Sequence, residues 1–259
     1  MTLGIRLLGS GTSSGVPRIG ADGPDWGQCD PADPRNRRTR ASLLVASATT
    51  RLLIDTSPDM REQLLAAGAP RIDAVLWTHE HADHVHGIDD LRQLFQLRGS
   101  AMPCHARPDT LKRLVNRFHY AFQGGGPYPA LLSGQPITGP VTIGDIRVDW
   151  VDMPHGGITS TGFRFTSGAH SVAYATDFAQ VTGAMVSLFK GCSLFVVDAL
   201  RRRPHPTHPH LALTLDFIDR VAPRQAILMH MDSSMDYATI AAELPAGVQP
   251  GFDGLEMQA

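Results

Sequence analysis

The chain has 259 residues, of which 42% are hydrophobic and 19% charged, and its formal net charge at pH 7 is −2. This composition is typical of an ordinary globular protein large enough to bury a substantial core. A net charge this close to zero gives no global basic field for nucleic acid, and no run of about eighteen apolar residues could span a membrane.

The cysteines indicate a reducing compartment. Cys29, Cys104 and Cys192 are widely separated, and none belongs to a CxxC pair. A sparse, odd set does not make a disulfide framework, and a cysteine-based zinc finger is not expected. The apolar run at the N-terminus is too short for a signal peptide. We therefore expect a cytoplasmic protein.

Strands and helices are expected to alternate along the whole chain. Short runs rich in Val, Ile and Leu predict strands at Gly4–Leu8, Ser42–Ser47, Leu52–Asp55, Ala74–Thr78, Met102–Ala106, Asp145–Asp152, Thr161–Phe165, Ser171–Thr176, Leu194–Asp198 and Ala226–Met229. Helical patterns cover Pro58–Ala67, Gly87–Gln96, Pro108–Phe122, Val181–Phe189, Leu211–Val221 and Tyr237–Leu244. This order favours two packed sheets with helices outside, in a single domain over residues 1–259. Gly20–Thr39 and residues 123–140, rich in Gly and Pro, are expected to be long loops.

Residues 79–84 read His-Glu-His-Ala-Asp-His and directly follow one of the predicted strands. His79 and His81 are two apart, so at the end of an extended strand they point the same way. Asp83 and His84 lie on the turn into the next helix and can face a neighbouring point. Imidazole and carboxylate together suit zinc, manganese and iron, so this segment predicts ligands for two nearby metals.

Single histidines and an aspartate follow three later strands. They are His155, Asp177 and His230, each directly after or near the end of an apolar run. A lone residue of this kind is more often a cap or a turn residue. Taken together, their number, type and shared position at strand ends indicate metal ligands, because a two-metal site needs about seven to eight ligands from protein and water.

The HxHxDH run, followed in order by His155, Asp177 and His230, resembles the metallo-β-lactamase superfamily. The resemblance implies an α+β fold, a four-layer αβ/βα sandwich with a two-metal site at one edge. It also implies the ligand sets: His79, His81 and His155 for one metal, Asp83, His84 and His230 for the other, and Asp177 bridging both. Asp55 matches an early aspartate that supports the histidine loop.

The segments Leu8–Pro17 and Gly251–Glu256 resemble the phosphodiesterase branch of that superfamily, near the phosphoribosyl 1,2-cyclic phosphate phosphodiesterases. tRNase Z is a more distant cousin. The resemblance implies a further histidine, a general acid or phosphate contact, before the last helices. Aligning Leu211 gives His208 that role, with His205 and His210 as alternates. The branch's cysteine-rich zinc loop is reduced here to Cys29, which puts the structural zinc in doubt.

The implied chemistry is hydrolysis of a small, possibly cyclic phosphodiester with two divalent metal ions, zinc or manganese. Water activated by the metals attacks phosphorus and His208 protonates the leaving oxygen, with Asp83 as the other predicted catalytic residue. Two loop segments are candidate phosphate contacts. The first could equally be only a tight turn, and the second only a solvated loop. The candidate residues are Ser10, Thr12 and Ser13 in the first, and Arg37, Arg38 and Arg40 in the second.

Two other functions stay open. One is a different hydrolase of the superfamily, acting on a thioester, lactone or β-lactam. The other is a non-hydrolytic metal protein resembling the pyrroloquinoline-quinone accessory group. The expected partner is a small molecule, without membrane and with nucleic acid not favoured, and a homodimer is left open. Among the other histidines, His86 is expected to be exposed or supporting and His119 to line the core or substrate, while His105 and His170 are expected to be structural.

Overall fold

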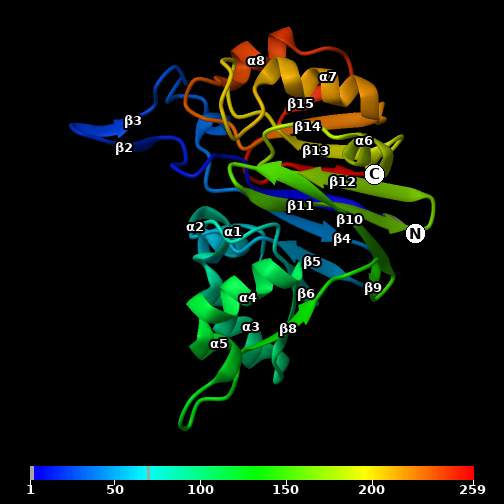
Figure 1. The fold of residues 1–259 in the computed structure, drawn as a ribbon. Helices are drawn as coiled ribbons and strands as arrows, with labels where there is room; N and C mark the ends of the chain where they lie inside the picture. Colours follow the sequence, from blue (N-terminus) through cyan, green and yellow to red (C-terminus); the bar gives the residue numbers. More distant parts are fainter. Residues whose placement is uncertain (1–2, 69–70) are drawn as a thin grey trace.

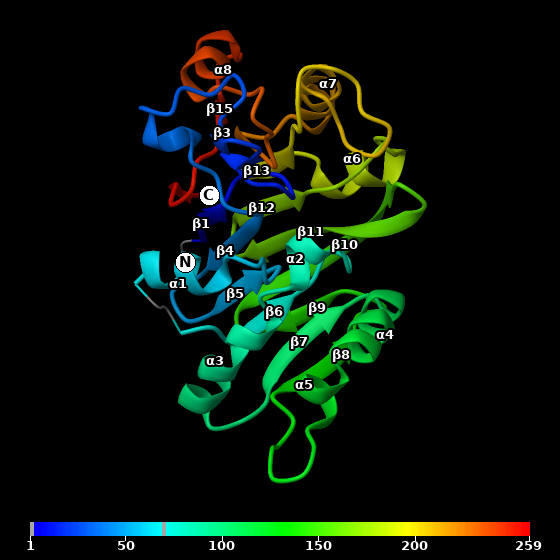
Figure 2. The ribbon, with the colours of Figure 1, turned by 90° about the vertical axis from the view of Figure 1, so that its left-hand side faces the viewer.

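Two facing sheets, each covered on its outer side by helices, form the molecule (Figure 1). The computed structural model describes residues 3–68 and 71–259. A view turned by 90° shows α6, α7 and α8 on one outer side and α3, α4 and α5 on the other (Figure 2). The predicted α+β sandwich of four layers is confirmed.

The first sheet has seven strands in the order β16-β1-β4-β5-β6-β7-β8. From β5 to β8 neighbouring strands are parallel, and the pairs on the β1 side are antiparallel. The strand bounds are β1 Gly4–Gly9, β4 Ser42–Ala46, β5 Arg51–Ile54, β6 Ala74–Leu76, β7 Met102–Ala106, β8 Leu132–Pro136 and β16 Glu256–Gln258.

The second sheet also has seven strands, in the order β15-β14-β13-β12-β11-β10-β9. The strands from β12 to β15 are parallel, and those from β9 to β12 pair antiparallel. The bounds are β9 Val141–Ile143, β10 Ile146–His155, β11 Ile158–Ser167, β12 His170–Ala175, β13 Leu194–Asp198, β14 Gln225–Met229 and β15 Val248–Pro250.

Eight α-helices and two short 3₁₀ turns are assigned among the described residues. They are η1 Pro34–Asn36, α1 Met60–Ala66, α2 Ala82–Val85, η2 Ile88–Asp90, α3 Leu91–Arg98, α4 Pro108–Arg117, α5 His119–Gln123, α6 Gly183–Phe189, α7 Leu211–Val221 and α8 Tyr237–Glu243. No helix in this part of the chain is long and apolar enough to cross a bilayer.

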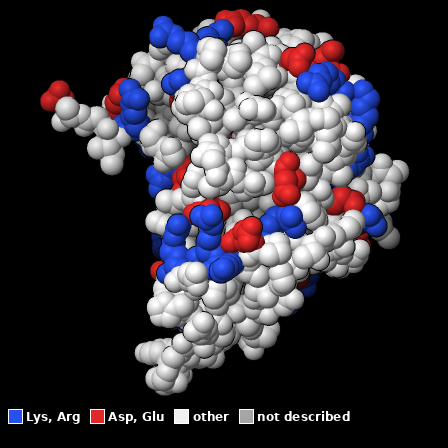
Figure 3. All heavy atoms as spheres, viewed as in Figure 1, with Lys and Arg blue, Asp and Glu red and all other residues white. Residues whose placement is uncertain are grey.

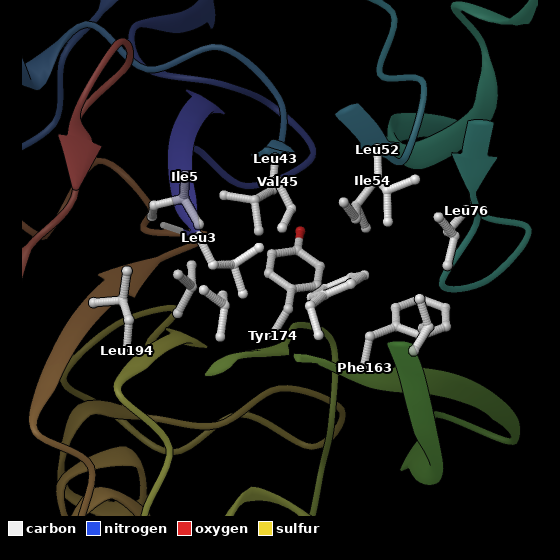
Figure 4. Packing of buried hydrophobic residues seen from close by; sticks show 14 of the residues in the cluster. Leu3, Ile5, Leu43, Val45, Leu52, Ile54, Leu76, Phe163, Tyr174 and Leu194 are labelled. Carbon is white, nitrogen blue, oxygen red and sulfur yellow. The ribbon is translucent and has the colours of Figure 1, made fainter. Parts of the chain in front are cut away.

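The main core lies between the two sheets. Tyr174 and Phe163 of the second sheet face Val45, Ile54 and Leu76 of the first (Figure 4). Alternate residues of each strand point inward, which is why the apolar runs have a period of two. Separate apolar clusters lie under the outer helices of each sheet. A core shared by both sheets is what one domain requires. The assignment of residues 1–259 to one domain stays a prediction, and residues 1–2 and 69–70 lie outside the described residues.

A small hairpin leaves the body of the molecule (Figure 1). It is formed by β2 (Arg18–Gly20) and β3 (Gly23–Asp25). Its Ile19 is fully exposed. The segment Gly20–Thr39 is expected to be a loop; among the described residues its regular elements are the last residue of β2, β3 and η1.

Several predicted elements are wrong in extent: β10 runs three residues beyond the predicted Asp152, and β11 begins three residues before the predicted Thr161. Three others are divided or of another type. The helix expected at Pro108–Phe122 is two helices, because Phe118 has φ −118° and ψ 38°, outside the helical region. The helix expected at Gly87–Gln96 is preceded by α2 and starts with the 3₁₀ turn η2. Residues 123–140, expected to be a loop, include β8, whose pairing with β7 depends on tertiary contacts.

Both sheets direct their parallel strands so that carboxyl ends meet at one edge of the sandwich. β5 and β6 of the first sheet end there, as do β10, β12, β13 and β14 of the second. Segments that leave parallel strands at a shared edge can place side chains together, although they are far apart in sequence. The predicted ligands lie at or just beyond the ends of these strands.

Candidate metal centre

The histidine loop is anchored by a buried carboxylate. Asp55, which follows β5, accepts hydrogen bonds from the Thr78 amide (2.8 Å) and hydroxyl (2.8 Å). Its Oδ2 also lies 2.8 Å from His84 Nδ1. β6 ends at Leu76, so His79 and His81 lie in the loop beyond it and not at the tip of the strand. Asp55 therefore supports the loop in the way the resemblance implied.

One group of nitrogens gathers three imidazoles. The ligand atoms of His79, His81 and His155 lie within 4.8 Å of one another. His155 Nε2 is 3.2 Å from His81 Nδ1, and its Nδ1 contacts the Thr207 carbonyl at 2.9 Å. The Thr207 contact fixes the ring of His155, as such outer hydrogen bonds do for metal-binding histidines.

A second group combines Asp83, His84 and His230, again within 4.8 Å. Asp83 Oδ2 lies 3.4 Å from His84 Nε2 and 3.7 Å from His230 Nε2. The two histidines come from different sheets, since His84 follows β6 and His230 follows β14. The centre therefore spans the gap between the two halves of the sandwich.

Asp177 lies between the two groups. Its Oδ1 is 3.9 Å from His79 Nε2 and 3.5 Å from His155 Nε2. Its Oδ2 is 3.2 Å from His84 Nε2 and 3.5 Å from His230 Nε2. One carboxylate thus presents a different oxygen to each group, which is the geometry of a bridging ligand.

Four nitrogens of the buried histidines have no hydrogen-bond partner among the described residues. They are Nε2 of His79 and His84 and both ring nitrogens of His230. A buried polar atom without a partner costs free energy, so such atoms need an explanation. Imidazole nitrogens and carboxylate oxygens at these separations fit a divalent metal. The residues present could therefore hold one ion in each group.

The ionisable side chains of the centre strongly influence one another's pKa. Burial raises the pKa of Asp177, but His230 and His84 outweigh it and hold that pKa well below the usual range. Burial lowers the pKa of His84, but Asp83 and Asp177 outweigh it and raise that pKa. Burial also lowers the pKa of His230, but Asp177 and Asp198 outweigh it and raise that pKa to about 9. The carboxylates thus attract positive charge to these imidazoles, and a divalent cation can supply it in place of protons.

Three residues of the centre have a left-handed backbone. Asp55, Asp177 and His230 have φ of 62°, 59° and 58°. Residues other than glycine rarely adopt this region, and each such residue costs about 1–3 kcal/mol. Asp55 and His230 come directly after a strand and Asp177 two residues after one, where the sharp turn directs the side chain into the edge of the sandwich.

His208 lies in the cleft that contains the centre, and the two alternates do not line it. The cleft has a volume of about 320 Å³ and is lined by Ser13, His81, Ala82, Asp83, His155, Gly156, Asp177, Thr207 and His208. His208 Nδ1 is 3.5 Å from Asp177 Oδ1, and its ring stacks on His230 at 5.1 Å. The ring of His205 packs edge-on against that of His208, and His210 is the residue before α7.

Asp198 belongs to the site and was not predicted. It ends β13, is fully buried, and accepts a hydrogen bond from the Asp177 amide at 3.0 Å. The same oxygen lies 3.3 Å from His208 Nδ1 and 3.6 Å from His230 Nδ1. Its sequence signal is an aspartate closing an apolar strand, the same signal that identified Asp177.

The predicted phosphate contacts are partly wrong. Arg38 is 1% exposed and donates to the carbonyl of Met235 at 2.6 Å, so it holds the loop and cannot meet a substrate. The Ser10 amide and hydroxyl donate to Asp253 instead. Arg40 pairs with Asp59. Arg37 is exposed and Thr12 is buried, and of the six candidates Ser13 lines the cleft.

Besides His205, His208 and His210, four histidines lie outside the donor groups. His86 is exposed and lies edge-on to Phe118, and His119 is exposed on α5 and so is not part of the core. His105 and His170 are half-buried in strands, in line with a structural role.

The model of the β-lactamase superfamily domain matches residues 50–231, which include all the predicted ligands. The chain belongs to the β-lactamase superfamily. This confirms the resemblance drawn from the HxHxDH run. The match also covers Asp198 and His208.

Relatives within the superfamily carry different names. A crystal structure described as a new diphosphatase from the PhnP family is 33% identical, with a TM-score of 0.89, and the match covers 100% of this chain and 98% of that one. A Porphyromonas gingivalis protein named octanoyltransferase is 35% identical over 96% of this chain and 50% of its own length. A Bradyrhizobium ribonuclease Z is 35% identical over 52% of this chain and 47% of its own. The chain thus spans about half the length of these two curated relatives.

Proposed function

We propose that this superfamily member is a metal-dependent hydrolase that cleaves a small phosphodiester or phosphoanhydride. The observation that carries the proposal is Asp177, whose two oxygens face separate donor groups across one cleft. We assign His79, His81 and His155 to one divalent ion and Asp83, His84 and His230 to a second, with zinc or manganese as the candidates. A pair of ions bridged in this way suits displacement at phosphorus.

The names of the relatives support the choice of phosphorus chemistry. The structure that is 33% identical over nearly both whole chains is described as a diphosphatase, and a further relative is named ribonuclease Z. Hydrolysis of a diphosphate and of RNA both break a bond between phosphorus and a bridging oxygen, which must leave. A cleft of about 320 Å³ is suited to a small-molecule substrate.

Bound divalent ions would supply Lewis acidity, which lowers the pKa of water and offsets charge on the phosphoryl oxygens. The chain supplies the proton for the leaving oxygen. We assign this to His208, because its Nδ1 lies 3.3 Å from Asp198 and can donate there, which leaves the other ring nitrogen to exchange a proton. Asp198 acts through His208 and Asp177, so it is a positioning residue.

The three cysteines that the structure describes are buried free thiols, which suits a reducing compartment. We therefore propose that the protein acts in the cytoplasm.

Activity and metal content, measured together, test the proposed function. Protein loaded with zinc or manganese is expected to hydrolyse bis(p-nitrophenyl) phosphate and at least one member of a panel of cyclic nucleotides and diphosphates. His81→Ala and Asp177→Ala are expected to abolish this activity and lower metal content. His119→Ala, which changes an exposed histidine outside the centre, should leave both unchanged. Full metal content in the unmodified protein without any activity on phosphorus would overturn the proposal.

The rival hydrolase chemistry is tested with the same preparations. An octanoyl thioester, a lactone and a β-lactam complete the panel, the first because one relative is named octanoyltransferase. Turnover of the thioester with none of the phosphodiesters would favour the rival. The pyrroloquinoline-quinone type of function is less well supported, because the donor set in this chain is complete.

A further inference from the structure

A second hollow opens directly beside the metal centre. It is lined by Glu80, His81, Ala82, His86, Arg117 and Phe118. His81 and Ala82 also line the cleft of the centre, so the two hollows meet over these two residues. We call this second hollow the side branch. A substrate whose phosphorus lies in the centre can extend into it.

Arg117 brings a positive charge to the side branch. Its Nη1 donates to the Glu80 carbonyl at 2.7 Å, which holds the guanidinium next to the histidine loop. Within the described part of the chain Arg117 forms no ion pair, whereas Arg113, one turn earlier on α4, pairs with the Glu80 carboxylate at 3.1 Å. The charge of Arg117 is therefore available to an anionic ligand. Figure 3 shows lysine and arginine atoms gathered over this region, with acidic atoms among them.

Phe118 and His86 bring rings to the same hollow. Their centroids are 5.8 Å apart and their planes meet at 86°. The guanidinium carbon of Arg117 lies 6.0 Å from the Phe118 centroid. An exposed histidine, a half-buried phenylalanine and an arginine form the kind of surface on which a planar base can stack.

We propose that the side branch binds the nucleoside monophosphate half of the substrate, with its base on Phe118 and His86 and its phosphate on Arg117. The inference rests on the proposed function, because it places the scissile phosphorus in the metal centre. It names a substrate class within that function: compounds in which a nucleoside phosphate is joined to a second group through phosphorus. Arg117 and Phe118 would then determine specificity.

A fatty chain is the other apolar ligand to consider. A flexible chain binds best where carbon atoms surround it, and the side branch is a shallow hollow with two imidazoles and a guanidinium on its wall. A planar ring needs contact on one face only, and every base offers such a face. The wall chemistry therefore favours a base.

Calorimetric binding of the metal-loaded protein tests the proposal without turnover. AMP is expected to bind about tenfold more tightly than ribose 5-phosphate, the size of effect that one base stacked on an aromatic ring produces. Phe118→Leu keeps the apolar volume and removes the ring face, so it should reduce this preference to about twofold. Tyr120→Leu is the matched control, because Tyr120 is an exposed aromatic residue two positions away and outside the side branch.

The arginines provide a second matched pair. Arg117→Gln should weaken AMP binding about tenfold, because it removes the unpaired charge. Arg113→Gln removes the other tie between α4 and Glu80 and should leave AMP binding unchanged. Equal losses in both variants would mean that the arginines only position the histidine loop, and this would overturn the role given to Arg117.

Two results overturn the whole proposal: equal affinity for AMP and ribose 5-phosphate, or tighter binding of decyl phosphate than of AMP. Either can occur while the enzyme still hydrolyses bis(p-nitrophenyl) phosphate, so the proposed function would survive. Conversely, AMP preference without any hydrolysis of phosphorus substrates would support the side branch and contradict the proposed function.

Discussion

Asp198 shows how one buried carboxylate can connect several residues of this site. Its Oδ2 holds the amide of Asp177 and lies within 3.6 Å of a nitrogen in both His208 and His230. Its Oδ1 is buried without a hydrogen-bond partner among the described residues. Asp198 therefore connects the residue between the two donor groups to the residue assigned as general acid.

His208→Gln is expected to lower kcat by about 10²- to 10⁴-fold while metal content is retained, because a general acid contributes on this scale. Turnover of bis(p-nitrophenyl) phosphate and elemental analysis of the same sample check both parts. His205→Gln serves as control, since His205 packs behind His208 and does not line the cleft. Loss of metal in His208→Gln would show that His208 is a ligand instead.

The sequence could identify the ligands because of where they lie. His79, His81, Asp83 and His84 lie within six positions, His155 ends an apolar strand, and Asp177 and His230 follow one. The same rule would have found Asp198. It could not have shown that Arg38 is buried, because this depends on contacts with residues 232–235, nearly two hundred positions away. Long-range contacts of this kind leave no local pattern.

At the scale of elements, one half-buried carboxylate connects three segments. Asp253 accepts hydrogen bonds from the amide and hydroxyl of Ser10, at the end of β1, and from those of Thr39, before β4. Burial raises the pKa of Asp253. The loop between β1 and β4, which includes the cleft residue Ser13, is thereby attached to the C-terminal segment.

Asp253→Ala should lower the free energy of unfolding by about 3 kcal/mol, because it leaves buried donors without an acceptor. Chemical denaturation measures the change. Asp219→Ala on α7 is the matched control, since Asp219 is exposed and should cost less than about 0.5 kcal/mol. Equal effects of both variants would contradict the structural role of Asp253.

His105 on β7 gives a pH prediction. Burial lowers its pKa below the ordinary value of 6.5, so the unfolded chain binds a proton at this residue more readily than the native chain. Its contribution to stability is complete above about pH 6.5 and is lost as the pH falls below that value. His105→Gln should therefore lose less unfolding free energy between pH 7.5 and 5.5 than the unmodified protein. An identical loss in both would contradict the lowered pKa.

Elements of ordinary length could be predicted, and short or broken ones could not. The predicted bounds of β7, β13 and α7 are those of the structure. β15 and β16 have three residues each, too few for a period to be recognised. α4 and α5 form one continuous helical pattern in the sequence, and their break at Phe118 occurs without Gly or Pro to mark it.

At the scale of the whole molecule, the centre joins two halves. The order of strands and helices predicted two sheets with outer helices, because each apolar face must be buried. Which strands meet at which edge was supplied only by the family resemblance. The donors come from both sheets, so an ion held by His84 and His230 also holds the sheets to each other.

Metal removal should therefore reduce thermal stability as well as activity. At a free zinc concentration about 100 times its Kd, binding adds about 2.7 kcal/mol, or roughly 5–10 °C in Tm for a domain of this size. Calorimetric scans before and after chelation check this shift, and Asp177→Ala should show little of it. An unchanged Tm on removal of bound metal would contradict the assignment of the donors.

The left-handed backbone at Asp55, Asp177 and His230 sets stability against activity. Glycine would relax the backbone at each position, so a screen that selects only for heat resistance of the metal-free chain should enrich glycine there. The selected variants would be more stable and catalytically inactive. A lineage that keeps the larger side chains at all three turns is thus under selection for chemistry, and this provides a way to tell active homologues from decayed ones by reading three positions.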